Sequence, residues 1–137
     1  MHDTRSVFES KGLRCTRRRI ELYETLAACR CHPTAEQLHR LVAARSPGTS
    51  LATVYNTLEA FTHAGLCRKF TTSGGGARFD ADITNHLHVV TDDGRLIDVP
   101  HDLGESILAG IKSEAVARLE KEMGVTIGHV EVHLRAV

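Results

Sequence analysis

The sequence predicts an α+β fold made of two modules, residues 1–80 and 86–137, joined by a connector at 81–85. In the first module, segments with apolar residues at helical spacing precede two short alternating segments. The second module follows the order strand, strand, helix, strand. Residues 1–70 carry 11 Lys and Arg against 6 Asp and Glu, whereas residues 71–137 carry 6 against 11. A basic half joined to an acidic half indicates two modules with different partners.

Residues that are favoured at helix caps mark the ends of the helices expected in the first module. A short helix over 3–12 comes first, and Gly65 ends the last helix, because glycine is favoured at helix C-caps. The residues expected to cap or start the helices between them are Thr16, Thr34 and Ser50. The segments 66–71 and 77–80 alternate like strands around a glycine-rich turn. This order describes a winged helix-turn-helix module, so we expect this half to bind double-stranded DNA.

The candidate recognition helix is 50–64, because its polar side chains suit base edges and phosphates. These side chains are Ser50, Thr53, Tyr55, Asn56 and Thr57. Further candidate DNA-binding residues open the helix that follows Thr16, namely Arg17, Arg18 and Arg19. Cationic side chains at a helix N-terminus oppose the helix dipole, and a DNA phosphate would relieve that conflict. A solvated basic turn is the structural alternative.

The second module is short and contains a hairpin, a helix and a last strand. We expect strands at 86–90 and 95–99, then one long helix over 103–123, because apolar residues recur there at every fourth position. Alternation returns over 125–137. A module of about 50 residues buries little apolar surface alone, so we expect it to pair with a second copy in a homodimer.

Two histidines and a carboxylate in this hairpin form a candidate metal site. His86 and His88 lie on one face of their strand, because side chains two residues apart point the same way. The hairpin turn brings Asp98 back toward them, and this ligand set suits Zn, Fe(II) or Mn. A metalloenzyme using the three as a facial triad is one alternative, and an adaptor with an ordinary polar strand is another. His129 and His133 share a face of the last strand, but no carboxylate motif converges on them.

The sequence also indicates where in the cell the protein is expected. No apolar run approaches the ~18 residues that span a membrane, and the first residues lack the apolar core of a signal peptide. We therefore expect a cytoplasmic protein with no membrane partner. The cysteines fit reduced thiols better than a disulfide framework, and they are Cys15, Cys29, Cys31 and Cys67.

Several motifs together resemble the ferric uptake regulator family over nearly the whole chain. They are the segments 12–19, 32–36 and 50–58, the wing end Arg78-Phe-Asp80, and His86-Leu-His88 followed by the segment 94–98. The resemblance implies a metal-dependent transcriptional repressor rather than an enzyme. It implies a homodimer that binds an inverted-repeat DNA operator. It also implies Fe(II) or Mn(II) as the regulatory ion, with Zn able to occupy the site in purified protein.

The same resemblance implies a regulatory site with ligands from both modules. Its ligands would be His32, Asp80, His86, His88 and Asp98. The metal would bind one closed arrangement of the modules better than the open one and so shift the population toward it. The closed dimer would present its two recognition helices at the spacing of two half-sites.

The identity of one ligand points to a branch of the family. Asp80 is typical of peroxide-sensing members, whereas iron-sensing members more often carry Glu there. In the peroxide-sensing branch, Fe(II) reacts with hydrogen peroxide, a ligand histidine is oxidised, and the repressor releases DNA. Here that residue would be His32 or His86. An iron- or manganese-level sensor without peroxide chemistry is the alternative.

The chain also departs from the family pattern. Most members hold a structural zinc with two Cys-x-x-Cys pairs, but this chain has Thr91-Asp-Asp-Gly94 at one expected place and ends at Val137 near the other. We therefore expect no structural four-cysteine zinc and a dimer held by packing alone. A second histidine-rich site also looks lost, since Asn85, Leu87 and Val130 stand where its ligands would be.

Overall fold

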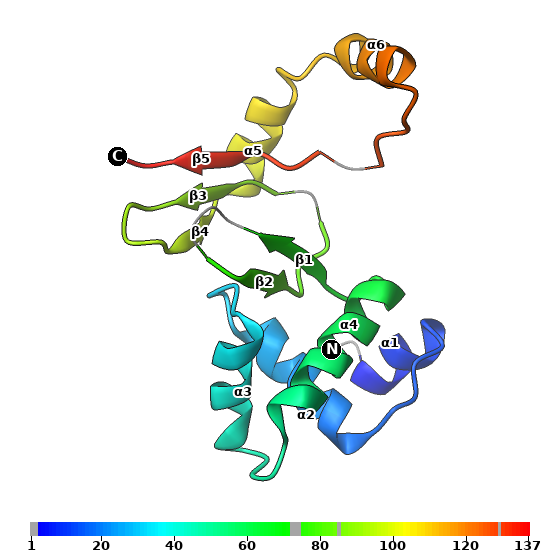
Figure 1. Cartoon of the computed structure of the whole chain (residues 1–137), viewed down its shortest axis with the longest axis vertical. Coiled ribbons are helices and arrows are strands. Elements are labelled where there is room, and N and C mark those ends of the chain that lie inside the picture. Colours follow the sequence, from blue (N-terminus) through cyan, green and yellow to red (C-terminus); the bar gives the residue numbers. More distant parts are fainter. Residues whose placement is uncertain (1–2, 72–74, 85, 129) are drawn as a thin grey trace. The chain divides into compact units, whose positions relative to one another are not determined.

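The computed structural model describes residues 3–71, 75–84, 86–128 and 130–137 in two compact units, Met1–Thr84 and Asn85–Val137 (Figure 1). The predicted glycine-rich turn at 72–74, Asn85 in the predicted connector and His129 lie outside the described residues. Both units combine helices with small sheets, so the predicted α+β class is confirmed.

The first unit holds four helices and a two-stranded hairpin. These elements are α1 (Thr4–Ser10), α2 (Arg17–Ala28), α3 (Ala35–Ala43), α4 (Leu51–Ala64), β1 (Arg68–Thr71) and β2 (Ala77–Asp80). The side chains of Thr16, Thr34 and Ser50 each accept a hydrogen bond from a backbone N–H in the first turn that follows. Each therefore satisfies a donor that the helix leaves unpaired, as predicted. Gly65 ends α4 in the left-handed conformation, with φ of 73°.

An aromatic cluster packs α1, α2 and α4 of the first unit together. Phe8 of α1 lies 5.6 Å from Tyr23 of α2 and 5.5 Å from Phe61 of α4, measured between ring centroids. Phe8 and Phe61 are fully buried. Burying such a side chain stabilises the fold by roughly 1.5–3 kcal/mol. The backbone N–H of Phe79 also donates to the carbonyl of Pro33, so β2 is tied to the loop that precedes α3.

The second unit contains a three-stranded sheet in the order β4-β3-β5. Its elements are β3 (His88–Val90), β4 (Leu96–Asp98), α5 (His101–Leu108), α6 (Ser113–Met123) and β5 (His133–Arg135). The pair β3–β4 is antiparallel and the pair β3–β5 is parallel. A parallel pair needs a long crossover, which α5 and α6 supply. Gly104 of α5 lies close to Leu87, since a Cβ built there would stand 3.7 Å from the Leu87 Cγ.

The prediction of one long helix over 103–123 is wrong. The chain leaves the helix after Leu108, where the N–H groups of Gly110 and Ile111 donate to carbonyls only three residues earlier. A new helix begins at Ser113. Gly110 is a poor helix former, costing about 1 kcal/mol relative to Ala in a helix interior. The apolar period continues across this break, so periodicity alone does not reveal it. The flanking strands are also shorter than expected.

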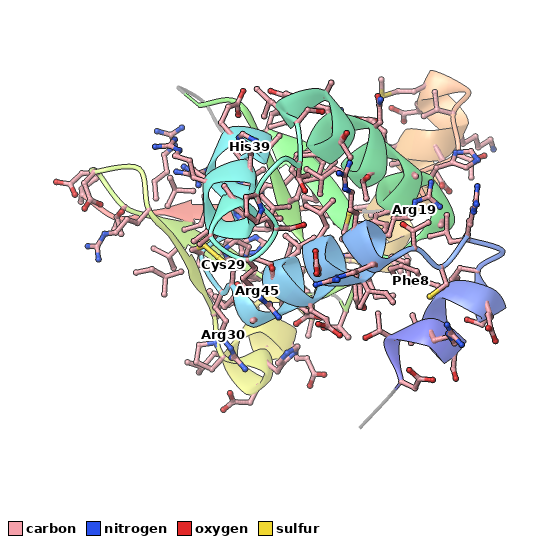
Figure 2. The ribbon with its side chains drawn as sticks, turned by 90° about the horizontal axis from the view of Figure 1, so that it is seen from below. Phe8, Arg19, Cys29, Arg30, His39 and Arg45 are labelled. Carbon is pink, nitrogen blue, oxygen red and sulfur yellow. A yellow bond between two sulfur atoms is a disulfide. The ribbon has the colours of Figure 1, made fainter. Side chains whose placement is uncertain are left out.

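The expectation of four reduced cysteines is wrong for one pair. Cys29 and Cys31 form a disulfide at the end of α2 (Figure 2). Cys29 is the C-cap of α2 and has extended backbone, which leaves the two Cα atoms 5.3 Å apart. That separation lies within the usual range for a disulfide. Cys15 and Cys67 are free thiols, and burial raises the pKa of the Cys67 thiol.

Within the described segments, none of the helices has both the length and the apolar character needed to cross a bilayer.

Replacing Gly65 by Ala should destabilise the first unit. The change forces a side chain into the left-handed region, which costs roughly 1–2 kcal/mol. A Cβ at this position meets nothing within 4 Å, so the effect is conformational and not steric. Urea unfolding measures the loss. The control is Gly76→Ala, where a Cβ also meets no atom and φ is not positive. Equal midpoints for the two variants would contradict the account.

Candidate functional site

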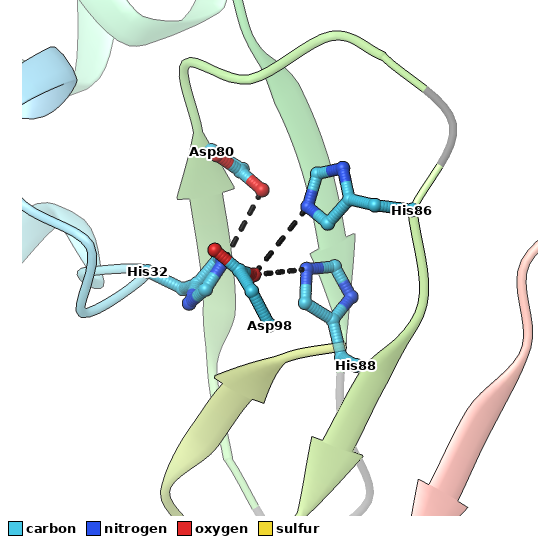
Figure 3. A group of neighbouring side chains, drawn as sticks. All are labelled: His32, Asp80, His86, His88 and Asp98. Carbon is cyan, nitrogen blue, oxygen red and sulfur yellow. Dashed lines mark ion pairs between the residues drawn. The ribbon is translucent and has the colours of Figure 1, made fainter. Parts of the chain in front are cut away.

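The second unit brings three potential ligands together on its sheet. The antiparallel register places His88 directly opposite Asp98, and His86 precedes His88 by two residues. The Nε2 atoms of His86 and His88 lie 3.5 Å and 3.4 Å from the same Asp98 carboxylate oxygen (Figure 3). The ligand atoms of all three side chains lie within 4.8 Å of one another. The hairpin therefore gathers the predicted His86, His88 and Asp98.

These separations fit a shared divalent cation. Two ligand atoms about 2.1 Å from one ion stand roughly 3.0–3.4 Å apart at octahedral or tetrahedral angles. The His86 and His88 ring centroids are 4.6 Å apart with the rings inclined at 76°, so both rings can direct a nitrogen at one point. A set of imidazole and carboxylate ligands without thiolate suits Zn, Fe(II) and Mn(II).

The first unit pairs two further potential ligands, His32 and Asp80. Asp80 ends β2, and its carboxylate lies 3.2 Å from the Nε2 atom of His32 (Figure 3). The guanidinium of Arg78 donates to the His32 carbonyl at 3.0 Å, and the His32 ring packs edge-on against Phe70. The wing strand and the loop before α3 thus meet at His32.

His32 has an uncommon backbone conformation. Its φ is 47°, and it is the only non-glycine residue with positive φ in the described chain. Histidine tolerates this region better than most residues, but it still requires support from its surroundings. The bonds from Arg78 to His32 and from Phe79 to Pro33 supply that support. These two hydrogen bonds, to consecutive carbonyl groups, hold the backbone that carries the buried imidazole.

Two histidines that the sequence did not assign to a site lie beside the hairpin ligands. His133 of β5 pairs with His88 in the parallel ladder, and their ring centroids are 5.8 Å apart. His101, the first residue of α5, lies 6.1 Å from His86 by the same measure. The alternating pattern of residues 130–134 predicted that His133 lies on one face of a strand. The sequence did not show which strand this last strand pairs with.

Most of the predicted DNA-binding residues are exposed, and several also make local contacts. Arg17, Arg18, Ser50, Tyr55 and Asn56 are exposed, whereas Arg19 and Thr53 are half-buried. The Ser50 and Thr53 hydroxyls lie 2.9 Å apart at the start of α4. Thr57 was expected on the polar face and is instead buried in the first unit. That assignment is wrong, because Thr57 lies one turn after Val54 on the side of α4 that faces the core.

Tyr55 connects the candidate recognition helix to α3. Its hydroxyl donates to the Glu36 carboxylate at 2.5 Å. This hydrogen bond raises the pKa of Tyr55 and lowers the pKa of Glu36, because it stabilises the neutral phenol and the charged carboxylate. At the start of α2, Arg17 pairs with Glu21 at 2.9 Å and Arg19 donates to the Arg14 carbonyl at 3.2 Å.

Comparison with known proteins finds relatives that are similar to this chain in sequence and in fold. A model of the ferric uptake regulator family matches residues 10–130. The peroxide operon regulator of Bacillus subtilis is 31% identical over 101 residues, which cover 71% of this chain and 70% of that protein. The crystal structure of the Vibrio cholerae ferric uptake regulator matches with a TM-score of 0.71 and 25% identity over 98% of each chain. A ferric uptake regulator from Pseudomonas aeruginosa with manganese matches with a TM-score of 0.68 and 27% identity, covering 99% of this chain and 97% of that chain.

Replacing Asp98 by Asn should lower the affinity for Mn(II). The variant keeps the size of the side chain but removes the charge that both hairpin imidazoles face, so we expect a loss of at least about tenfold. Isothermal titration calorimetry measures it. Asp92→Asn in the same hairpin is the matched control, because Asp92 is exposed in the turn. An equal affinity for the two variants would exclude Asp98 as a ligand.

Proposed function

The chain belongs to the ferric uptake regulator family, and we propose that it is a metal-dependent DNA-binding repressor that responds to peroxide. The observation that carries this proposal is the convergence of His86, His88 and Asp98 at separations that suit a metal ion. A repressor of this kind needs a cation site, a DNA-binding surface and a link between them.

We propose that one cation takes ligands from both units. The His32–Asp80 pair supplies two donors, and the hairpin supplies His86, His88 and Asp98. Ions of this class accept four to six ligands, so a cation held by all five is bound more tightly than one held by either set alone. Binding therefore favours the arrangement of the chain in which both sets reach the ion. No thiolate takes part in this ligand set.

His32 also has a short covalent route to the DNA-binding elements. It stands two residues before Thr34, the N-cap of α3, and four residues before Glu36. Glu36 accepts the hydrogen bond from Tyr55 on α4. A cation that fixes His32 thereby favours one position of α3 and of the candidate recognition helix.

The DNA-binding surface would combine the start of α2 with α4. Arg17, Arg18 and Arg19 would neutralise phosphates, while Ser50, Thr53, Tyr55 and Asn56 would lie near phosphates and base edges in the major groove. The concentration of basic residues in 1–70 favours this assignment. An inverted-repeat operator would then bind the two copies of a homodimer.

Exposed apolar side chains in the second unit support the homodimer. They occur along α5, α6 and the turn between them, and they are Leu103, Ile107, Ile111, Leu119 and Met123. Large apolar side chains exposed in this number on one small unit are typical of an interface. All four cysteines lie within residues 1–70, so the second unit has no thiolate with which to hold a structural zinc. Packing between two copies would replace that zinc.

Asp80 and the similarity to a peroxide operon regulator favour peroxide as the signal. Fe(II), when bound, would activate hydrogen peroxide at this site. In the net reaction the imidazole of His32 or His86 would lose two electrons and gain one oxygen atom, and the second peroxide oxygen would leave as water. The second candidate function is a sensor of iron or manganese level. The similarity to a ferric uptake regulator studied with manganese favours it.

Arg18→Ala should weaken DNA binding without changing the affinity for Mn(II). Loss of one phosphate contact reduces the slope of log affinity against log salt by about one. Fluorescence anisotropy with an inverted-repeat duplex, selected from a random pool by the Mn(II)-loaded protein, measures this. Lys121→Ala, on α6, is the control and should leave the slope unchanged. An unaltered slope in Arg18→Ala would remove Arg18 from the DNA interface.

Fe(II)-loaded protein treated with hydrogen peroxide should gain one oxygen on His32 or His86. Peptide mass spectrometry locates the oxygen, and Mn(II)-loaded protein should remain unmodified, because Mn(II) is not readily oxidised by hydrogen peroxide. His63, an exposed histidine of α4, is the internal control. Oxygen found only on cysteine or methionine would overturn the peroxide proposal and favour the metal-level sensor.

A further inference from the structure

We propose that His133 is a further ligand of the cation held by His86, His88 and Asp98, so that the second unit carries four ligands of its own. This inference rests on the proposed function and adds a ligand to its site. It also makes the last strand of the chain part of the metal centre. Three features of the second unit lead to it.

The register of the sheet places His133 in a row with two other ligands. The antiparallel ladder pairs His88 with Asp98, and the parallel ladder pairs His88 with His133. Directly paired residues on neighbouring strands project from the same face of a sheet. Asp98, His88 and His133 therefore form one row across β4, β3 and β5, with His88 in the middle.

The ring separations place His133 near binding distance. Two imidazoles bound to one ion, with metal–nitrogen distances of about 2.1 Å, have ring centroids roughly 4.5–5.2 Å apart. The His86 and His88 centroids are already 4.6 Å apart, and those of His88 and His133 are 5.8 Å apart. Binding of both rings to one ion therefore requires the His133 ring to approach the His88 ring by about 0.6 Å.

The surroundings of His133 favour a cation. A Glu131 carboxylate oxygen lies 4.0 Å from the Nε2 atom of His133, and Asp98 lies on the far side of His88. These two carboxylates place negative charge near the ring, which favours a bound cation. His133 is 24% exposed, so little of its solvation must be lost when it binds.

The proposal has a structural consequence for β5. The ladder continues beyond His133, since the Ala136 N–H donates to the Val90 carbonyl at 3.0 Å. A cation held by both His88 and His133 would fasten β5 to β3 through side chains as well as through the backbone. Metal binding should therefore slow hydrogen exchange at the Ala136 amide.

The test compares Mn(II) binding by the full chain and by His133→Gln. We expect a loss of at least about tenfold in affinity, with an unchanged apo melting temperature. The matched control is His101→Gln, which removes another histidine near His86 but outside the row. In the wild-type protein, Zn(II) should shift the His133 ring-nitrogen resonances in NMR and slow Ala136 exchange. These two measurements do not depend on any variant.

The outcomes separate this inference from the proposed function. If His133→Gln binds Mn(II) like the wild type while His88→Gln does not, His133 is not a ligand and the proposed function stands. A loss confined to His101→Gln would likewise overturn the inference. If His88→Gln also retains wild-type affinity, the hairpin site itself is wrong. An unshifted His133 resonance in Zn(II)-loaded protein would count against the inference whatever the variants do.

Discussion

The register of β3 between β4 and β5 determines which side chains come together in the candidate metal centre. A slip of one residue would send His88 to the opposite face, because neighbouring side chains alternate. The turn at 91–95 fixes the register: the Thr91 N–H donates to the Arg95 carbonyl, and the Gly94 N–H donates to the Thr91 carbonyl. Gly94 has φ of 82°, a conformation that glycine adopts without strain. A turn without cysteines therefore still positions the candidate ligands of the second unit.

In the first unit, the backbone conformation at His32 is the corresponding constraint on the position of the candidate ligands. The bonds from Arg78 and Phe79 hold the loop against the wing, and the Thr34 cap begins α3 directly afterwards. The hydrogen bond between Glu36 and Tyr55 continues this series of contacts to α4. In the proposed function, a cation at His32 and Asp80 would act on elements that are already connected, so a change at the ligand would alter the position of the candidate recognition helix.

Sequence patterns predicted the features that depend on local chemistry. The caps at Thr16, Thr34 and Ser50, the end of α4 at Gly65, and the shared face of His86 and His88 follow from spacing and residue type. Features that depend on tertiary pairing were missed. The break at Gly110 lies within an unbroken apolar period, and Thr57 is polar although it faces the core. The Cys29–Cys31 disulfide depends on where α2 ends, and the place of His133 depends on a parallel pairing across 42 residues of intervening chain.

The central claim is that one cation couples the two ligand sets to DNA binding. Coupling between two binding sites is reciprocal, so Mn(II) must raise the affinity for the selected duplex by the same factor by which the duplex raises the affinity for Mn(II). Titrations of each ligand with and without the other measure both factors in the same buffer. The account predicts equal factors of at least about fivefold. Equal DNA affinity in Mn(II) and in chelator would contradict it.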